Sequence, residues 1–380
     1  MPHAGTVISP IVIPFALRPR DGRFGCGPSK IRPEAMTALA EVGATWMGTS
    51  HRQDPVREVV GSVREGLRAL FGLPDGWEVV LGNGGTTVFW DIATFGLVTE
   101  RSQHLVFGEF SSKFAEAAAR APHLGPPAVI RSEPGTHPVA AAASEIDAYA
   151  LTHNETSTGV MMPLKRPVGA APDALVLVDA TSAAGGLTWT PSEVDVYYFA
   201  PQKCFSSDGG LWLACCSPAA VERIDRIASS GRWVPASLDL RIALENSRAN
   251  QTYNTLALAT LFLLDQQVRW MLDHGALDWS VGRSQQSSRT LYDWALDRPF
   301  ATPFVASAAE RSTVVGTIDL IGVDAPTVSS VLRSNGIVDT ESYRKLGRNQ
   351  VRIGLFPSID PDDVEALTRC IDYVVERLAG

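Results

Sequence analysis

The stretch ALVLVDATSAAGGLTWTPSEVDVYYFAPQKC, residues 174–204, contains two apolar runs that each end beside a charged side chain. The first run ends with Asp179, and the second, residues 194–200, is followed by Lys203. Apolar runs of this length predict buried strands, and a lysine is rarely placed beside one without a reason. Lys203 could extend its amine to solvent from the strand end, or it could act as a base or a Schiff-base partner.

Similar apolar runs occur along the chain up to residue 275, with helical patterns between several of them. Further strands are predicted at residues 77–83, 104–107, 128–130, 149–153 and 211–216. Helices are predicted at residues 54–70, 86–97, 112–120, 218–228 and 255–272. In the first of these helices we expect Asp54 as the N-cap and Pro55 in the first turn. Near-continuous apolar strands that alternate with helices indicate a mostly parallel sheet covered by helices on both faces.

Beyond residue 275 the pattern changes to a smaller α+β set. Helices are predicted near residues 280–297, 325–336 and 360–378, and strands at residues 312–320 and 350–356. We therefore expect an α/β fold with two domains. The large α/β domain would cover residues 28–275, and the small α+β domain would cover residues 276–380 and be joined by the segment 1–27.

The composition limits the classes of function. Of the 380 residues 45% are hydrophobic, and the net charge of −8 comes without a basic block, which argues against nucleic acid as a partner. Five cysteines without CxxC spacing are typical of a reduced, cytoplasmic protein. No uninterrupted apolar run approaches the roughly 20 residues of a membrane helix. The seven histidines form no HExxH motif and no Cys/His cluster, so no metal is expected.

A third predicted strand end carries the glycine turn of LGNGGTT, residues 81–87. A strand, a glycine turn and a helix present free N–H groups that suit a phosphate, although the same pattern also makes an ordinary tight turn. Asp179 could likewise cap the following segment through Thr181 and Ser182, or it could pair with a cationic ring nitrogen. The turn, the acid and the lysine together match the needs of pyridoxal 5′-phosphate (PLP), namely a phosphate site, a pyridinium partner and an amine for the aldehyde.

A second candidate anion site lies in MGTSHRQDPVRE, residues 47–58. His51 and Arg52 stand just before the helix that starts at Asp54, so their side chains and the helix dipole could bind one anion together. A solvated His–Arg pair is the alternative, and the sequence leaves both open.

With these positions in view, the chain resembles the phosphoserine aminotransferases, a class V family of the fold-type I PLP enzymes. The matching stretches are FGCGPSKIRPEAM (24–36), GTSHRQDPVREVV (48–60), LGNGGTTVFWD (81–91), THNETSTGV (152–160), VDATSAAGG (178–186), APQKCF (200–205), QTYNTLAL (251–258) and VRIGLFP (351–357). They span nearly the whole chain. The combination of the APQK element with the early GPS and SHR elements is specific to this family rather than to class V in general.

The resemblance implies a role for each matching position. Lys203 and Asp179 would be the catalytic residues, the first bonded covalently to the cofactor and the second paired with its ring nitrogen. The resemblance also implies that Gly85 and Thr86 of the glycine turn and Gln202 bind the cofactor phosphate. Phe110 would stack on the ring, and Thr156 would bind the ring hydroxyl. Asn254 and Thr255 would bind the cofactor phosphate of the neighbouring subunit. The last pair implies a homodimer with shared active sites, although Asn254 could instead cap the helix 255–272.

The implied substrate contacts include two departures from the family pattern. Arg352 would bind the substrate α-carboxylate, and His51, Arg52, Tyr343 and Arg344 would bind its other anionic end. Tyr343 and Arg344 are the residues nearest to where many members carry a His-Arg pair. Thr86 stands where an arginine is common.

The reaction implied is transfer of the amino group of L-glutamate to 3-phosphohydroxypyruvate, which gives O-phospho-L-serine and 2-oxoglutarate in serine biosynthesis. The related substrate of pyridoxine biosynthesis, 4-phosphohydroxythreonine, stays open. Another class V PLP enzyme, such as a cysteine desulfurase or lyase, would need a mobile cysteine on a late loop, but Cys370 falls in the last helix and Cys204 adjoins Lys203. A non-enzymatic binding protein on a PLP scaffold is the other alternative, and the presence of both Asp179 and Lys203 argues against it.

Overall fold

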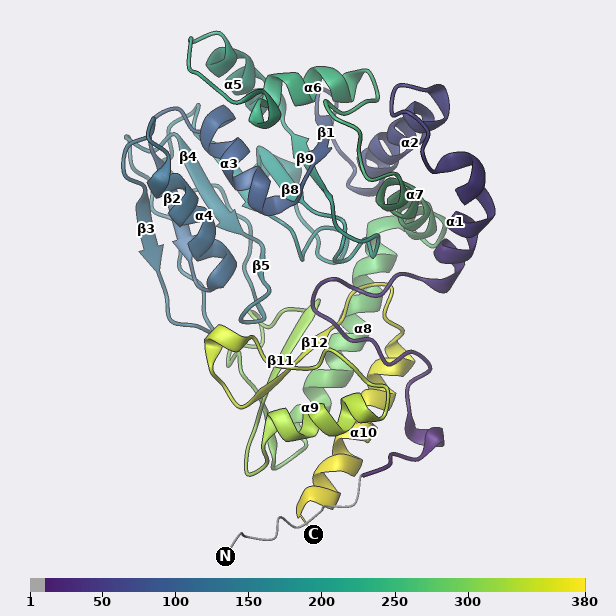
Figure 1. Ribbon diagram of the computed structural model, residues 1–380. Coiled ribbons are helices and arrows are strands. Elements are labelled where there is room, and N and C mark those ends of the chain that lie inside the picture. The colour runs from purple at the N-terminus through teal and green to yellow at the C-terminus, as the bar shows by residue number, and fades with distance from the viewer. Residues whose placement is uncertain (1–10, 380) are drawn as a thin grey trace, which may run out of the picture.

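A seven-stranded sheet organises the larger part of the computed structural model, which describes residues 11–379 (Figure 1). In spatial order its strands are β1 (Glu78–Asn83), β9 (Leu211–Cys216), β8 (Val196–Phe199), β7 (Leu175–Asp179), β4 (Ala148–Thr152), β2 (Ser102–Val106) and β3 (Ala128–Arg131). Neighbouring strands from β8 to β3 are parallel, whereas β9 is antiparallel to both of its neighbours. The expected mostly parallel α/β sheet is therefore confirmed, with β9 reversed.

Helices cover both faces of this sheet, and alternate strand residues face two different cores. In β7, Leu175 and Leu177 pack with residues of α3, α4, α5 and α6 on one face. Val176 and Val178 pack with residues of α2 and α7 on the other face. The helices involved are α2 (Asp54–Leu70), α3 (Thr86–Gly96), α4 (Glu109–Arg120), α5 (Pro218–Ala228), α6 (Leu240–Arg248) and α7 (Leu258–Asp273). Because both faces are covered, every residue of β7 is buried, which explains its continuous apolar sequence.

A three-stranded antiparallel sheet organises the C-terminal part, in the order β10 (Ala301–Pro303), β11 (Val315–Leu320) and β12 (Gln350–Gly354). The helices α8 (Ala276–Leu296), α9 (Ala325–Ser334) and α10 (Pro361–Ala379) accompany it (Figure 1). The described part of the N-terminal segment reaches α10, where Tyr373 Oη donates to the Val12 carbonyl at 3.1 Å. The expected domain boundary at residue 275 stays a prediction, and residues 1–10 of the segment 1–27 lie outside the described residues.

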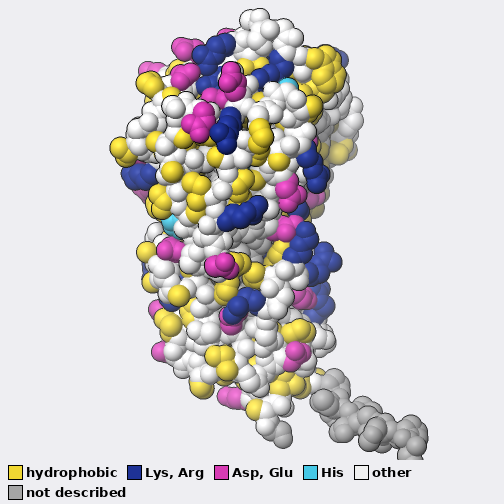
Figure 2. All heavy atoms as spheres, turned by 90° about the vertical axis from the view of Figure 1, so that its left-hand side faces the viewer, with side chains coloured by type: hydrophobic (Ala, Val, Ile, Leu, Met, Phe, Trp, Pro, Cys, Tyr) yellow, Lys and Arg dark blue, Asp and Glu magenta, His cyan; other side chains and the backbone are white. Residues whose placement is uncertain are grey.

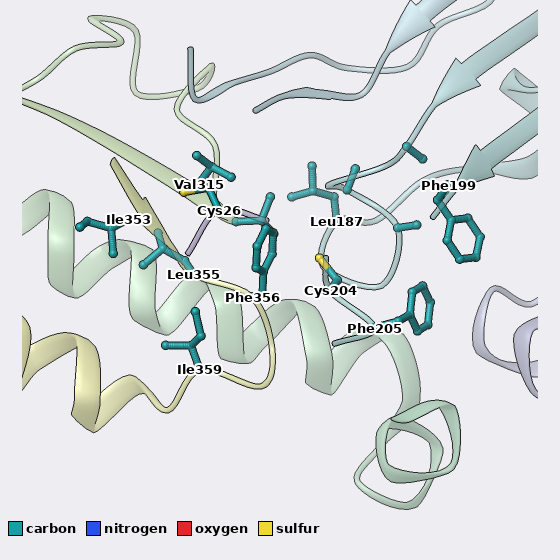
Figure 3. Packing of buried hydrophobic residues seen from close by; sticks show 14 of the residues in the cluster. Cys26, Leu187, Phe199, Cys204, Phe205, Val315, Ile353, Leu355, Phe356 and Ile359 are labelled. Atoms are coloured by element: carbon teal, nitrogen blue, oxygen red, sulfur yellow. The ribbon is translucent and has the colours of Figure 1, made fainter. Parts of the chain in front are cut away.

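A shared core joins the two sheets below the end of β8. Figure 3 shows Phe199, Cys204 and Phe205 on one side of it and Leu355 and Phe356, which follow β12, on the other. The rings of Phe199 and Phe205 stack with their centres 5.0 Å apart. The turn that carries Lys203 is therefore anchored by the apolar residues that follow it.

Some expected helix starts and caps differ from the structure, and the helices expected at 112–120 and near 280–297 begin three and four residues earlier, at Glu109 and Ala276. The helix expected at 255–272 begins at Leu258 with Ala257 as its N-cap, so Asn254 lies in the preceding loop and does not cap it. Asp54 is the first residue of α2 rather than its N-cap, which is Gln53. Helices α1 (Pro33–Trp46) and α6 were not predicted.

The face of the molecule in Figure 2 agrees with the absence of a basic stripe in the sequence. On the face that Figure 2 displays, Lys and Arg side chains are interspersed with Asp and Glu. Within residues 11–379, no helix combines the length and the apolar character needed to span a bilayer.

Candidate active site

Lys203 lies in the turn after β8, at the carboxyl edge of the large sheet. The residue is only 9% exposed, and its Nζ donates a hydrogen bond to the Cys26 carbonyl oxygen at 2.6 Å. Burial lowers the pKa of Lys203 to about 8, because the ammonium form is poorly solvated there. An appreciable fraction of the amine is therefore neutral near pH 7, as a base or nucleophile requires.

Neighbouring segments fix the position of this lysine. Ser206 Oγ, three residues after it, lies 2.5 Å from Ser358 Oγ and 3.2 Å from Ser29 Oγ. A Cβ atom added to Gly27 would lie 1.7 Å from Lys203 Nζ, so only glycine lets the N-terminal segment pass this close. The lysine is thus held between its own turn and the GPS element predicted from the sequence.

Asp179 ends β7, the strand beside β8, and is buried. Its Oδ2 accepts a hydrogen bond from Trp90 Nε1 at 2.9 Å, and its Oδ1 accepts from the Thr181 amide at 3.0 Å and from Thr181 Oγ1 at 2.5 Å. The local contact with Thr181 that the sequence suggested is present, but Trp90 of α3 adds a partner from another element. Burial raises the pKa of Asp179, so a cation placed beside it would be strongly favoured.

The glycine turn leads from β1 into α3. Gly84 has a φ of +112°, and Gly85 is the N-cap of α3. The amides of Gly85, Thr86 and Thr87 have no acceptor within residues 11–379, and a Cβ at Gly85 would meet no atom within 4 Å. Gln202 Oε1 is also buried and without a partner in the described chain. An open helix N-terminus of this kind suits the phosphate of PLP.

Thr156 and Phe110 are positioned by buried hydrogen bonds. Thr156 Oγ1 donates to Ser182 Oγ at 2.8 Å. Glu155 is completely buried and accepts hydrogen bonds from the Phe110 amide at 3.3 Å and from the amide and hydroxyl of Ser111, each at 2.9 Å. Glu155 therefore fixes the start of α4, which carries Phe110, next to the strand that leads to Thr156.

Arg352 of β12 reaches the same region from the C-terminal part. Its Nη1 donates to the Thr156 carbonyl oxygen at 3.1 Å, and its Nε is buried without a partner among the described residues. Its guanidinium carbon lies 5.3 Å from the centre of the Tyr343 ring, and that ring is 6.0 Å from the ring of Phe110. The structure thus brings Arg352, Thr156, Phe110 and Tyr343 together.

A second cluster contains Thr255, one of the two predicted dimer residues, and His51, a predicted substrate residue. His51 Nδ1 lies 3.2 Å from Thr255 Oγ1, and the Thr255 carbonyl accepts from Asn83 Nδ2 at 2.7 Å. Burial and the nearby charge of Arg52 lower the pKa of His51, which favours a neutral imidazole. Within residues 11–379, no hydrogen bond or ion pair joins this cluster to Lys203.

Arg52 and Arg344 are exposed, and their guanidinium groups make no hydrogen bond or ion pair with residues 11–379. The roles predicted for them and for His51 stay predictions.

All five cysteines are buried and free, so the mobile late cysteine that a desulfurase would need is not found among them. In the described part of the chain, no three His, Cys, Asp or Glu side chains gather closely enough to hold a metal ion.

Sequence reasoning missed three residues that shape the site. They are Trp90, which binds Asp179, Glu155, which fixes the start of α4, and Cys26, whose carbonyl accepts from Lys203. Trp90 lies one helical turn after Thr86 and therefore on the same face of the helix. This spacing could have been used to predict that Trp90 lies close to the residues of the glycine turn.

Comparison with known proteins places these features in a family. A family model described as "Aminotransferase class-V" matches residues 129–366. The chain is 62% identical over 368 residues to a phosphoserine aminotransferase of Nocardioides sp., covering 96% of this chain and 98% of that protein. It is 57% identical over 368 residues to a phosphoserine aminotransferase of Rhodococcus jostii, covering 97% and 98%.

Solved structures show the same fold at lower identity. A phosphoserine aminotransferase from Cytophaga hutchinsonii superimposes with a TM-score of 0.86 at 22% identity, covering 93% of this chain and 99% of that one. The phosphoserine aminotransferase from Bacillus circulans subsp. alkalophilus gives a TM-score of 0.80 at 20% identity, covering 95% and 99%.

Proposed function

Because this chain belongs to the class V aminotransferases, we propose that it uses PLP to transfer the amino group of L-glutamate to 3-phosphohydroxypyruvate, giving O-phospho-L-serine and 2-oxoglutarate. The observation that carries the proposal is the placement of buried Lys203 and Asp179 at the ends of the neighbouring strands β8 and β7. The names of relatives at 57% and 62% identity support the choice of substrate. The same names favour an aminotransferase over a cysteine desulfurase or lyase.

The residues of the site fit PLP. When bound, PLP supplies an aldehyde that bonds to an amine and a ring that withdraws electrons from the substrate Cα. The open amides of Gly85, Thr86 and Thr87, with Gln202, would hold its phosphate. Phe110 would lie against the ring face, and Thr156 would bind the ring hydroxyl.

Lys203 would move the proton. Its neutral amine would take the proton from the substrate Cα as general base, and the resulting ammonium would then act as general acid toward the bound cofactor. A pKa near 8 suits both steps, because the amine gains and loses a proton near physiological pH. The hydrogen bond to the Cys26 carbonyl would orient Nζ between these steps.

Asp179 would keep the ring nitrogen protonated. Trp90 and Thr181 hold its two carboxylate oxygens, so the side chain is oriented before any ligand arrives. Ionised Asp179 is poorly solvated where it lies, and a pyridinium cation would relieve that cost. Arg352 would pair with the substrate α-carboxylate, for which its unpaired Nε is available.

We further propose a homodimer in which Asn254 and Thr255 contact the cofactor phosphate of the partner. The contact between exposed Thr255 and buried His51 supports treating these two residues as one cluster. In that arrangement His51 and Arg52 would approach the distal anion of a substrate bound to the partner. Serine biosynthesis in the cytoplasm is the proposed setting, and 4-phosphohydroxythreonine is a proposed further substrate.

A spectroscopic half-reaction tests the proposal. The protein loaded with PLP should lose its visible absorbance on addition of L-glutamate and regain it with 3-phosphohydroxypyruvate. Hydroxypyruvate should restore the absorbance far more slowly, and the ketoacid of 4-phosphohydroxythreonine tests the second substrate. A response to L-cysteine with release of sulfide, and none to glutamate, would show a desulfurase instead.

A further inference from the structure

Three buried serine hydroxyls meet beside the turn that carries Lys203, and each comes from a different segment. Ser29 belongs to the GPS element, Ser206 to the turn after β8, and Ser358 to the loop between β12 and α10. Ser206 Oγ lies 2.5 Å from Ser358 Oγ and 3.2 Å from Ser29 Oγ, and the hydroxyls of Ser29 and Ser358 are 3.3 Å apart. These three residues are called the serine cluster below.

The serine cluster holds the peptide groups on both sides of the Lys203 Cα. The Ser29 amide donates to the Gln202 carbonyl oxygen at 2.7 Å. The Ser206 amide donates to the Lys203 carbonyl oxygen at 3.0 Å. Because these two peptide groups precede and follow the Cα, they set the direction in which the side chain leaves the backbone. The far end of the side chain is bound by the same N-terminal segment, since Nζ donates to the carbonyl of Cys26, three residues before Ser29.

The turn depends on contacts from outside it. Ser206 has a φ of +47°, in the left-handed region that a residue with a side chain rarely adopts. Such a conformation persists only where the surrounding structure holds it. Ser358 supplies one such contact from the C-terminal part, 152 positions along the chain from Ser206, and also donates to the Lys30 carbonyl oxygen at 3.3 Å. It therefore joins the turn to the N-terminal segment.

The buried place of the amine also determines its protonation, because burial lowers the pKa of Lys203 to about 8. The charged or titratable groups that act on this amine are Cys26, Cys204, Arg352 and Asp179. Burial raises the pKa of both thiols, so they stay neutral near pH 8. A serine hydroxyl does not titrate in this range, so the serine cluster can change the amine only through its position and its access to water.

We infer that Ser29, Ser206 and Ser358 are positioning residues, through which the N-terminal segment and the C-terminal part together hold the Lys203 amine in its buried place. The inference rests on the proposed function for the role of Lys203 and deepens it, because it names what keeps the amine ready to bond. Without one of these hydroxyls the turn would relax, and water would solvate the ammonium form better. The neutral amine would then be scarcer near pH 7.

The rate at which the cofactor-free protein bonds to PLP, followed by absorbance between about pH 6 and pH 10, tests the inference. The reaction needs the neutral amine, so the rate of the wild type should have its pH midpoint near 8. Ser358→Ala should raise this midpoint by about half a pH unit or more, which lowers the rate well below the midpoint about threefold. Ser358→Thr, which keeps the hydroxyl, should shift it less than Ser358→Ala.

Ser207→Ala is the matched control. Ser207 is buried in the same turn, but within residues 11–379 its hydroxyl contacts only the Pro201 carbonyl oxygen, at 3.3 Å. Its pH midpoint should therefore equal that of the wild type. Equal shifts in Ser358→Ala and Ser207→Ala would overturn the inference. A lower thermal unfolding midpoint of Ser358→Ala with an unchanged pH midpoint would also overturn it, because the hydroxyl would then contribute to stability alone.

The free energy of unfolding of the cofactor-free protein gives a second measurement, which needs neither PLP nor turnover. Between pH 7 and pH 10, Ser358→Ala should gain less stability than the wild type, because its folded Lys203 pKa would lie closer to the unfolded value of about 10.4. Parallel profiles of these two proteins would overturn the inference. Failure of the wild type to bond PLP or to react with glutamate would refute the proposed function, whereas the unfolding profiles would still decide the role of the serine cluster.

Discussion

At the scale of single residues, the burial of the Lys203 amine makes the stability of the folded protein depend on pH. Its folded pKa of about 8 lies below the value of about 10.4 expected in the unfolded chain. Between these two values the unfolded state binds more protons than the folded state, so burial of Lys203 destabilises the protein fully below pH 8 and progressively less as the pH rises.

Lys203→Met in the cofactor-free protein should remove this dependence. The wild type should gain about 2–3 kcal/mol of unfolding free energy relative to Lys203→Met between pH 7 and pH 10. Urea unfolding of both proteins at several pH values measures the difference. Parallel pH profiles would show that the amine is not buried as described.

Lys203 and Asp179 could be predicted from the sequence because each stands beside an apolar strand that stops abruptly. Trp90 could not be paired with Asp179 in the same way, since 89 positions separate them in the chain. Cys26 is 177 positions from Lys203. It contributes a backbone carbonyl, which every residue has, so its residue type could not indicate this contact. Contacts of this kind depend on packing between elements rather than on local pattern.

At the scale of elements, α3 serves two parts of the site. Its first turn offers the open amides after Gly85, and one turn later Trp90 binds Asp179. In the proposed site, the helix would therefore couple the amides that hold the phosphate to Asp179, the proposed partner of the ring nitrogen.

Trp90→Phe should remove the hydrogen bond to Asp179 while it keeps an aromatic side chain in the core. We expect PLP to bind about threefold to tenfold more weakly, as the loss of one hydrogen bond to a carboxylate implies, and the single-turnover reaction with glutamate to slow. Asp179→Asn is the comparison and should slow that reaction much more than Trp90→Phe does. If Asp179→Asn reacts within about threefold of the wild type, a difference under about 0.7 kcal/mol, the pyridinium role is wrong.

The sequence predicted most elements but not all of their limits or directions. Helix α2 was found because Val56, Val60, Val63 and Leu67 recur at helical spacing and are buried. The start of α7 was placed too early because Leu256 continues the apolar pattern into the preceding loop. Strand β9 is buried along its whole length, and such a sequence does not indicate whether the strand runs parallel or antiparallel.

At the scale of the whole molecule, the carboxyl edge of the large sheet and strand β12 of the C-terminal part contribute to one site. Arg352 binds the Thr156 carbonyl across this junction, and Lys345 binds Glu109. Thr255 and His51 belong to a different cluster, which fits the proposed contribution to a neighbouring subunit.

Mixing two inactive variants tests that arrangement. One carries Lys203→Ala, and the other carries Asn254→Ala with Thr255→Ala. If sites are shared, each heterodimer has one site with both lesions and one with neither, so random exchange should restore about a quarter of the sites. If subunit exchange is demonstrated and activity still does not recover, each site is built from a single chain.

The central claim is that Lys203 carries the cofactor, and covalent trapping tests it most directly. The chain has five lysines, at positions 30, 113, 165, 203 and 345. Reduction of the PLP-loaded protein with borohydride, followed by proteolysis and mass spectrometry, should place the pyridoxyl label on the peptide that contains Lys203. Lys203→Ala, treated in the same way, should remain unlabelled. A stoichiometric label on Lys30, Lys113, Lys165 or Lys345 would contradict the account.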